Sequence, residues 1–503
     1  MNKLIGKVIL TLAFAIALAG CGGGSSGGPG GGTQPGIDRL GVRSGTVTGF
    51  GSIIVGGDTF DVDMAEFEVD DDSSGSSQDD LNIGDTVIVT FDPATPGVAQ
   101  TVFSDDAVEG PIGGIGPDLD KNLQAGQLLV AGQTVTVDAE TSFDDRIQPA
   151  SFDGLAVDDL VEVNGFFDAN GGIRATRIEP SQGGIDGVEV HGFVEGLDTN
   201  AQTFSINALD VDYGTEPAII DDSFPNGTFA NGDFVEVKGT SFGAGGELLA
   251  TKIEPDGPGV VDDGTFDNFD EVELEAEGFI TRFASATDFD VSGFPVTTTA
   301  GTVFEGGDAT DLGPNVKVEV DGDLNASNVL VATKVSIRRS NNVRVTALVD
   351  EVDAAAGTLV VLGIEITVDA STRREDKSAA EQEPFGLEHI NVDDYVEVRG
   401  GVDPSGNSDL LASLLEREDR PNDMEGETEL RGFVDSVSQP SFVIAGVTIE
   451  TDGNTEFRDA NDMPMSANDF FNALQSDDLV DVQGTETGQT TLVAEEVEFE
   501  AED

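Results

Sequence analysis

Alternating apolar and polar residues recur along the chain and predict β-strands throughout. Three segments show the pattern clearly: 128–138 (LLVAGQTVTVD), 359–369 (LVVLGIEITVD) and 442–452 (FVIAGVTIETD). In each, a period of two on both sides of a glycine places every second side chain on one face, and the glycine permits a tight turn. Each segment therefore predicts a hairpin of two half-buried strands.

A second phrase marks the same unit six times. In residues 154–165 it reads GLAVDDLVEVNG, and it returns as FANGDFVEVKG (229–239), HINVDDYVEVRG (389–400) and ALQSDDLVDVQG (473–484). Across all six copies its first valine is Val87, Val161, Val235, Val318, Val396 and Val480. The resulting period of 74 to 84 residues is too long for a solenoid repeat and fits a small autonomous domain.

The order of elements within each unit predicts its fold. A strand with a Gly-x-Val opening precedes the hairpin, a variable stretch follows it, and the repeated phrase then leads into two strands. In residues 465–476 the variable stretch predicts a helix, with Ser466 as its cap, Asp469 three residues on, and Phe470, Phe471 and Leu474 on its apolar face. Three strands, a short helix or loop and two strands are the order of an OB-type barrel.

We therefore expect a mainly β protein of six tandem small OB-like β-barrels. The expected bounds of the barrels are 44–107, 108–182, 188–256, 272–338, 343–418 and 427–500.

The N-terminal residues have the layout of a secretory signal peptide. Two lysines precede an apolar run from Val8 to Leu18, which is too short to span a bilayer comfortably as a membrane anchor. Small residues follow, and Leu18 to Cys21 resembles a bacterial lipobox, whose cysteine is lipidated. The sequence thus predicts a signal peptide over 1–20, and a lipidated Cys21 followed by a flexible Gly/Ser tether over 21–43.

The charge of the chain excludes one class of partner. It has 24 Lys and Arg against 97 Asp and Glu, a formal net charge of −73, which repels a phosphate backbone, so we expect no nucleic-acid partner. The same charge favours cations or basic surfaces. With 38% hydrophobic residues in strand periodicity, the acidity does not indicate disorder. A single cysteine excludes internal disulfides and cysteine-based zinc clusters.

The acidic pairs in the repeated phrase have two interpretations, as ligands or as turn residues. The pairs are Asp158-Asp159, Asp393-Asp394 and Asp477-Asp478, and two other copies have Gly84 or Gly232 at the first position. Glycine, aspartate and asparagine all adopt left-handed or Asx conformations at low cost. This substitution pattern favours the turn.

Two acidic triplets are weak calcium candidates. They are Asp118, Asp120 and Asn122, and Asp321, Asp323 and Asn325, spaced like the first three ligands of a calcium loop. Neither triplet continues with the glycine and glutamate of such a loop, and a chain this acidic produces such triplets by chance. No other cofactor and no catalytic residue is expected.

The histidines and a basic stretch complete the candidates. His191 and His389 fall at different points of the repeat, which favours surface or strand-end positions over a histidine site. The fifth unit is locally basic, and its cations either neutralise the neighbouring acidic barrels or make a specific contact between barrels. They are Arg338, Arg339, Arg344, Arg373, Arg374 and Lys377.

The repeated phrases together resemble a family of uncharacterised repeats found in bacterial envelope lipoproteins. The shared features are the Gly-x-Val opening, the L-x-x-G-x-x-V-x-V-x-G phrase and a closing A-T-K-I-E, and they cover residues 44–500. The resemblance implies an OB-like barrel and an envelope location, and supplies no catalytic or binding residues. Gly22 after the lipobox cysteine favours the bacterial outer membrane, on its periplasmic or cell-surface side.

These observations predict a non-enzymatic, lipid-anchored envelope protein that serves as a spacer, scaffold or interaction module. Its expected partners are the membrane, through the N-terminal lipid, and envelope proteins, polysaccharide or cations. One alternative is a surface lipoprotein that binds polysaccharide or divalent cations, and a less favoured one is an envelope hydrolase.

Overall fold

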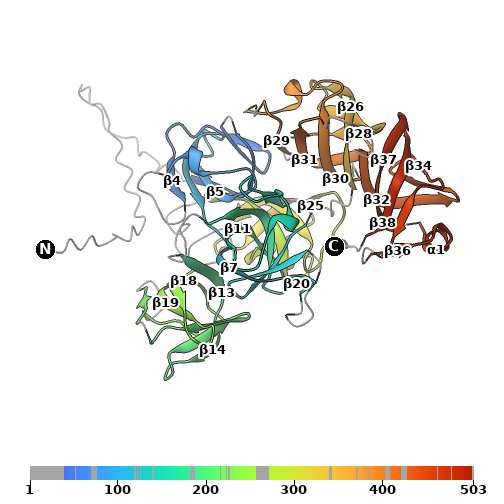
Figure 1. Ribbon diagram of the computed structural model, residues 1–503. Helices are drawn as coiled ribbons and strands as arrows, with labels where there is room; N and C mark the ends of the chain where they lie inside the picture. Colours follow the sequence, from blue (N-terminus) through green and yellow to red (C-terminus); the bar gives the residue numbers. More distant parts are fainter. Residues whose placement is uncertain are drawn as a thin grey trace, which may run out of the picture.

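The regular secondary structure of the computed structural model is almost entirely β-strand (Figure 1). The predicted signal peptide, Cys21 and most of the tether lie outside the residues that it describes. It describes residues 39–500 except 51, 70–75, 118–120, 122, 125, 139–140, 182–186, 216, 222–223, 225–226, 257–270, 339–342, 370–371, 381, 383, 403–407, 421–427, 461–462 and 477.

The second group of strands, barrel 2, shows how each unit closes on itself. Its strands are β7 (Val108–Ile115), β8 (Gln127–Val130), β9 (Gln133–Thr136), β10 (Ser142–Phe143), β11 (Leu160–Phe167) and β12 (Ile173–Pro180). The pairing runs from β7 to β8, β9, β12, β11 and back to β7, with β9 and β12 parallel. This is the strand order of an OB-type barrel, and it confirms the predicted fold. The short β10 adds a parallel strand beside β12.

Barrel 3 docks on barrel 2 through its first strand. Its strands are β13 (Val188–Phe193), β14 (Glu195–Asp198), β15 (Thr203–Ile206), β16 (Leu209–Asp212), β17 (Ile219–Ile220), β18 (Phe234–Phe242) and β19 (Leu248–Pro255). The first strands β7 and β13 pair antiparallel, so the two barrels form one sheet of thirteen strands.

Barrels 5 and 6 are joined in the same way and lie side by side in Figure 1. Barrel 5 contains β26 (Val343–Asp353), β27 (Thr358–Val361), β28 (Ile364–Thr367), β29 (Arg373–Asp376), β30 (Tyr395–Val402) and β31 (Leu410–Glu418). Barrel 6 contains β32 (Thr428–Ser438), β33 (Ser441–Ile444), β34 (Val447–Glu450), β35 (Glu456–Arg458), β36 (Pro464–Met465), β37 (Leu479–Gly488) and β38 (Thr491–Phe499). Their first strands, β26 and β32, pair antiparallel.

Barrels 1 and 4 form the third pair, although two barrels separate them in the sequence. Barrel 1 contains β1 (Arg39–Gly49), β2 (Ile53–Val55), β3 (Asp58–Phe60), β4 (Glu66–Val69), β5 (Thr86–Phe91) and β6 (Ala99–Ser104). Barrel 4 contains β20 (Glu271–Ser285), β21 (Asp288–Val291), β22 (Phe294–Thr297), β23 (Val303–Glu305), β24 (Lys317–Leu324) and β25 (Leu330–Arg338). Here the first strands run parallel, with residues 39–44 opposite 271–276.

The stretch before the repeated phrase is helical in several barrels. In barrel 6 it forms α1 (Ala467–Ala473), and in barrels 1, 2 and 5 it contains the 3-10 helices η1 (Gln78–Asp80), η2 (Phe152–Gly154) and η5 (Leu387–His389). Ser466 caps α1 by accepting a hydrogen bond from the backbone N–H of Asp469, and Phe470 is fully buried, as the sequence predicted. No helix in the described part of the chain is long and apolar enough to cross a membrane.

The apolar cores follow the pairing of the barrels. Buried residues of barrels 5 and 6 form one continuous cluster, and those of barrels 2 and 3 form another. The core of barrel 4 includes Leu40 and Val42 from β1, while the rest of barrel 1 has a smaller core of its own. Each pair is therefore one packed body, because its two barrels share both a sheet and buried apolar surface.

Candidate functional site

The acidic pairs of the repeated phrase form turns. The first residue of the pair has a positive φ of 75° at Asp158 and 72° at Asp393, and the equivalent Asn315 has a φ of 65°. Gly84 and Gly232 take the same conformation in barrels 1 and 3. Asn and Asp tolerate this left-handed region better than other side chains, which explains why they alternate with glycine here.

The second acid of each pair holds the turn closed. The Oδ2 atom of Asp159 accepts a hydrogen bond from the backbone N–H of Ala156, three residues earlier, at 2.8 Å. Asp233 and Asp394 accept equivalent bonds from the residues three before them, also at 2.8 Å. The turn interpretation is therefore confirmed for these copies, and Asp477 lies outside the described residues.

Charged side chains on the outer faces of the barrels become buried where two barrels meet. In β13, Val188 and Val190 face the core of barrel 3, whereas Glu189 and His191 point away from it. Glu189 is 9% exposed and His191 is 5% exposed, although period two places both on the outer face. The interpretation of His191 as a surface or strand-end residue is wrong, because packing against neighbouring segments removes it from water.

We call the group around His191 the histidine cluster; it contains Asp105, Glu189, His191, Glu236, Lys238 and Asp256. His191 Nδ1 lies 2.7 Å from Asp256 Oδ2, and Nε2 lies 3.3 Å from Glu189 Oε1. Lys238 Nζ lies 2.6 Å from Glu189 Oε2 and 2.8 Å from Glu236 Oε1. Burial alone would lower the pKa of His191, but the carboxylates of Asp256 and Glu189 raise it well above its usual value.

A second group, the carboxyl cluster, lies between barrels 1 and 4 and consists of Glu275, Glu319 and Asp321. Their carboxyl oxygens lie within 4.8 Å of one another. Arg43 Nε lies 3.0 Å from Glu275, Lys334 Nζ lies 2.9 Å from Asp321, and Glu319 has an ion pair with Arg338 at 2.7 Å. Burial and a hydrogen bond with Asp321 raise the pKa of Glu275 to about 10, because both favour the protonated carboxyl group.

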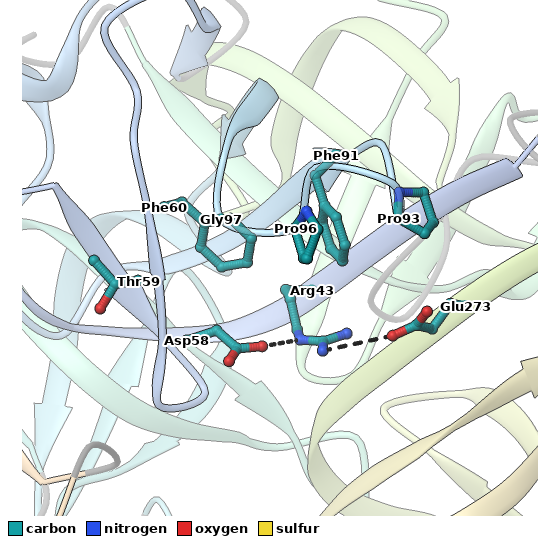
Figure 2. A pocket seen from close by; sticks show the side chains of 9 residues that line it. All are labelled: Arg43, Asp58, Thr59, Phe60, Phe91, Pro93, Pro96, Gly97 and Glu273. Atoms are coloured by element: carbon teal, nitrogen blue, oxygen red, sulfur yellow. Dashed lines mark hydrogen bonds and ion pairs between the residues drawn. The ribbon is translucent and has the colours of Figure 1, made fainter.

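Beside the carboxyl cluster, a cavity of about 340 Å³ opens along the junction of barrels 1 and 4. Figure 2 shows Arg43 at its centre, between Asp58 of β3 and Glu273 of β20. Arg43 Nε lies 2.7 Å from Asp58, and Asp58 and Glu273 are each about half exposed. Phe91 and Pro96 face the guanidinium from the other side, with Arg43 5.4 Å from the Phe91 ring centroid. The cavity thus combines an apolar wall with three charged groups that can form hydrogen bonds.

Arg373 of the basic fifth unit makes a contact between barrels. Its Nη1 donates to Ser142 Oγ at 3.1 Å and to the backbone oxygen of Thr176 at 3.2 Å, both in barrel 2. Arg344 bridges barrels 5 and 6 through an ion pair with Asp481 at 2.7 Å. For these two cations the structure supports the specific contact rather than general neutralisation.

Five segments of the chain match the family described as "Domain of unknown function (DUF5666)": residues 109–179, 191–254, 277–336, 345–416 and 431–498. The chain belongs to this family. The five DUF5666 repeats correspond to barrels 2 to 6. The predicted unit at 44–107 is not among the matched segments, although the strands of barrel 1 follow the same order.

The DUF5666 repeats give the fold of the chain but no biochemical role. Among solved structures, a Drosophila chain entitled "drosophila Unr CSD456" is similar at 14% identity, over 45% of this chain and 95% of that one, with a TM-score of 0.12. A score this low carries no argument about function. No curated protein matches.

The structure places the second predicted calcium triplet along and just after a strand of the fourth barrel. Asp321 and Asp323 lie in β24, and Asn325 follows it, where its Oδ1 accepts a hydrogen bond from Ser327 N at 2.8 Å. An extended strand separates residues four apart by about 13 Å. Asp321 and Asn325 therefore cannot bind one calcium ion together, and Asp321 belongs to the carboxyl cluster instead.

The remaining candidates are a lipidation site, a triplet and a histidine. Cys21 and the triplet Asp118, Asp120 and Asn122 lie outside the described residues. His389 ends η5 and stacks on Phe385, with 6.2 Å between ring centroids. The histidine cluster was missed because its members look like ordinary outward strand residues. The available signal was Glu-x-His on β13 beside Glu-x-Lys on β18, since both pairs face the same side of the sheet.

Proposed function

We propose that this chain is a non-catalytic scaffold of the bacterial envelope, anchored through a lipid on Cys21. The observation that supports it best is the joining of barrels through their first strands, which turns small domains into larger packed bodies. A continuous sheet and a shared core resist motion of the two barrels of a pair relative to each other. A spacer requires such rigidity. The signal peptide, lipobox and glycine-rich tether in the sequence support the anchor and the location.

The anchor is tested by Cys21→Ala in the full chain expressed in a bacterial host. We expect the variant to escape lipid labelling and leave the membrane fraction, whereas Ser26→Ala, in the same tether, remains with the membrane. Equal membrane association of wild type and Cys21→Ala would refute the lipid anchor.

A second candidate function is binding of envelope polysaccharide, and the cavity between barrels 1 and 4 favours it. A sugar ring offers an apolar face that packs on Phe91 and Pro96, and hydroxyls that bond to Asp58, Arg43 and Glu273. Its volume of about 340 Å³ falls within the usual range for small-ligand sites.

Thermal unfolding with and without soluble envelope glycan fragments separates the two functions. If the cavity binds glycan, the melting temperature rises for wild type and for Asp210→Asn, an exposed acid of barrel 3, and the rise is lost in Asp58→Asn and Glu273→Gln. If no fragment raises the melting temperature of the wild type, the glycan function is rejected and the scaffold function stands alone.

A further inference from the structure

The histidine cluster has the donor set of a transition-metal site. Its ligand atoms come from Asp105, Glu189 and His191, and these atoms all lie within 4.8 Å of one another. One imidazole nitrogen and two carboxylates suit zinc, because calcium and magnesium prefer oxygen ligands alone.

The two ring nitrogens of His191 lie at different distances from their carboxylate partners. Nδ1 lies 2.7 Å from Asp256 Oδ2, the distance of a strong charge-assisted hydrogen bond. Nε2 lies 3.3 Å from Glu189 Oε1, which is long for such a bond. Two ligands on a tetrahedral zinc ion, each about 2.05 Å from the metal, lie about 3.3 Å apart. The Nε2–Oε1 separation therefore equals the edge of a zinc tetrahedron.

The groups behind the ligands hold them in place. Metal-bound histidines usually donate the other ring N–H to a carboxylate, and Asp256 occupies that position on Nδ1. Glu189 is fixed through its second oxygen, which lies 2.6 Å from Lys238 Nζ. Two of the three ligands are thus already oriented, and both lie on β13.

Asp105 supplies the third ligand and the route of entry. It is exposed and lies between β6 and β7, in the segment that connects barrels 1 and 2. Its ligand oxygen lies within 4.8 Å of the other two, so a movement of about 1.5 Å or less brings it to the tetrahedral spacing of about 3.3 Å. Because Asp105 is exposed, a water molecule can supply the fourth ligand from its side of the site.

The charge of the cluster also favours a divalent cation. Four carboxyl groups, from Asp105, Glu189, Glu236 and Asp256, surround only two cationic side chains, and Glu189, His191 and Glu236 are buried. A metal ion on Nε2 replaces one proton with two positive charges and so compensates buried carboxylates more fully.

We propose that Asp105, Glu189 and His191 form a zinc site that ties the connection between barrels 1 and 2 to the first strand of barrel 3. Asp256 is a positioning residue, since it acts on the metal through His191. The ion joins two segments that are distant in sequence, so it acts as a clamp on the assembled barrels.

The test is a zinc titration of the full chain after removal of metals with a chelator. Isothermal titration calorimetry in 0.15 M salt measures affinity and stoichiometry, and the visible absorption of Co²⁺ reports tetrahedral coordination. We expect one zinc ion per chain and a melting temperature raised by about 5–10 °C when zinc is a hundredfold above its dissociation constant.

Four variants locate the site. We expect His191→Gln to weaken zinc binding at least a hundredfold, Asp105→Asn at least tenfold, and Asp256→Asn about 10- to 100-fold. His389→Gln, the other histidine, should bind like wild type. Asp105 is exposed, so we expect Asp105→Asn to fold. Its zinc affinity therefore tests the site even if His191→Gln fails to fold. Wild-type affinity in Asp105→Asn, or only weak multiple binding that salt suppresses, would overturn the proposal.

Discussion

The glycine that ends the repeated phrase offers a sharp test of the barrel geometry. Gly484 lies at a β-bulge in β37, where the register against β38 shifts between Gln483 and Gly484. A Cβ atom at Gly484 would overlap the backbone oxygen of Val493 and lie 3.0 Å from Ala494 Cα. The overlapped atom is part of the ladder between β37 and β38, so it cannot move without loss of hydrogen bonds.

The expected cost of Gly484→Ala follows from this overlap. Overpacking of a well-packed site costs about 1–3 kcal/mol. Barrels 5 and 6 share one core and should unfold together as a unit of about 150 residues, for which each kcal/mol lowers the melting temperature by about 2–4 °C. We therefore expect their transition to fall by about 2–12 °C.

Differential scanning calorimetry of the full chain measures this change, and Gly453→Ala is the matched control. Gly453 also lies in barrel 6, but a Cβ atom there meets nothing within 4 Å and its φ is not positive. Alanine at that position should leave stability unchanged or raise it by about 0.4–1 kcal/mol. Equal melting temperatures for the two variants would refute the close-approach explanation of the repeated glycine.

Three further predictions address the turns, the carboxyl cluster and the helix. Asp159→Ala removes the bond to Ala156 N and should cost about 1 kcal/mol in urea unfolding, while Asp159→Asn should cost less. Because the folded-state pKa of Glu275 is raised, its contribution to stability is full below pH of about 4.5 and declines as the pH rises toward that pKa. Glu275→Gln should remove this decline, so melting temperatures of variant and wild type converge at pH 4 and separate at pH 8; parallel curves would contradict it. Phe470→Ala deletes a ring that is 0% exposed and should lower the calorimetric stability of barrels 5 and 6 by about 3–5 kcal/mol, whereas an unchanged transition would exclude Phe470 from the core.

The sequence predicted the individual barrel well, because its signals are local. Period two identified the strands, and the alternation of glycine with Asp or Asn at position 158 and its equivalents identified a left-handed turn. Ser466 and its apolar partners identified α1. Each of these features depends on residues close in sequence, so composition and spacing were enough.

The pairing of barrels and the histidine cluster could not be predicted in the same way. Strands β1 and β20 join through backbone hydrogen bonds, which leave no signature in residue type. Outward Glu189 and His191 follow the ordinary solvent-facing alternation of a strand, but in the folded chain both are buried, next to Asp105. Local periodicity predicts which face of a sheet a side chain lies on, but it does not predict which segment of the chain covers that face.

The parallel junction of barrels 1 and 4 also makes the edge of barrel 1 depend on a distant segment of the chain. Thr46 in β1 and Glu277 in β20, joined by a hydrogen bond, are 231 residues apart. Contacts this distant in sequence form slowly, because a long loop must close first. Until barrel 4 docks, the outer edge of β1 lacks its partner strand, and an unpaired strand edge can pair with other chains. Arg43 on β1 is a charged residue of the kind that disfavours such pairing, and in the finished junction it lies 3.0 Å from Glu275.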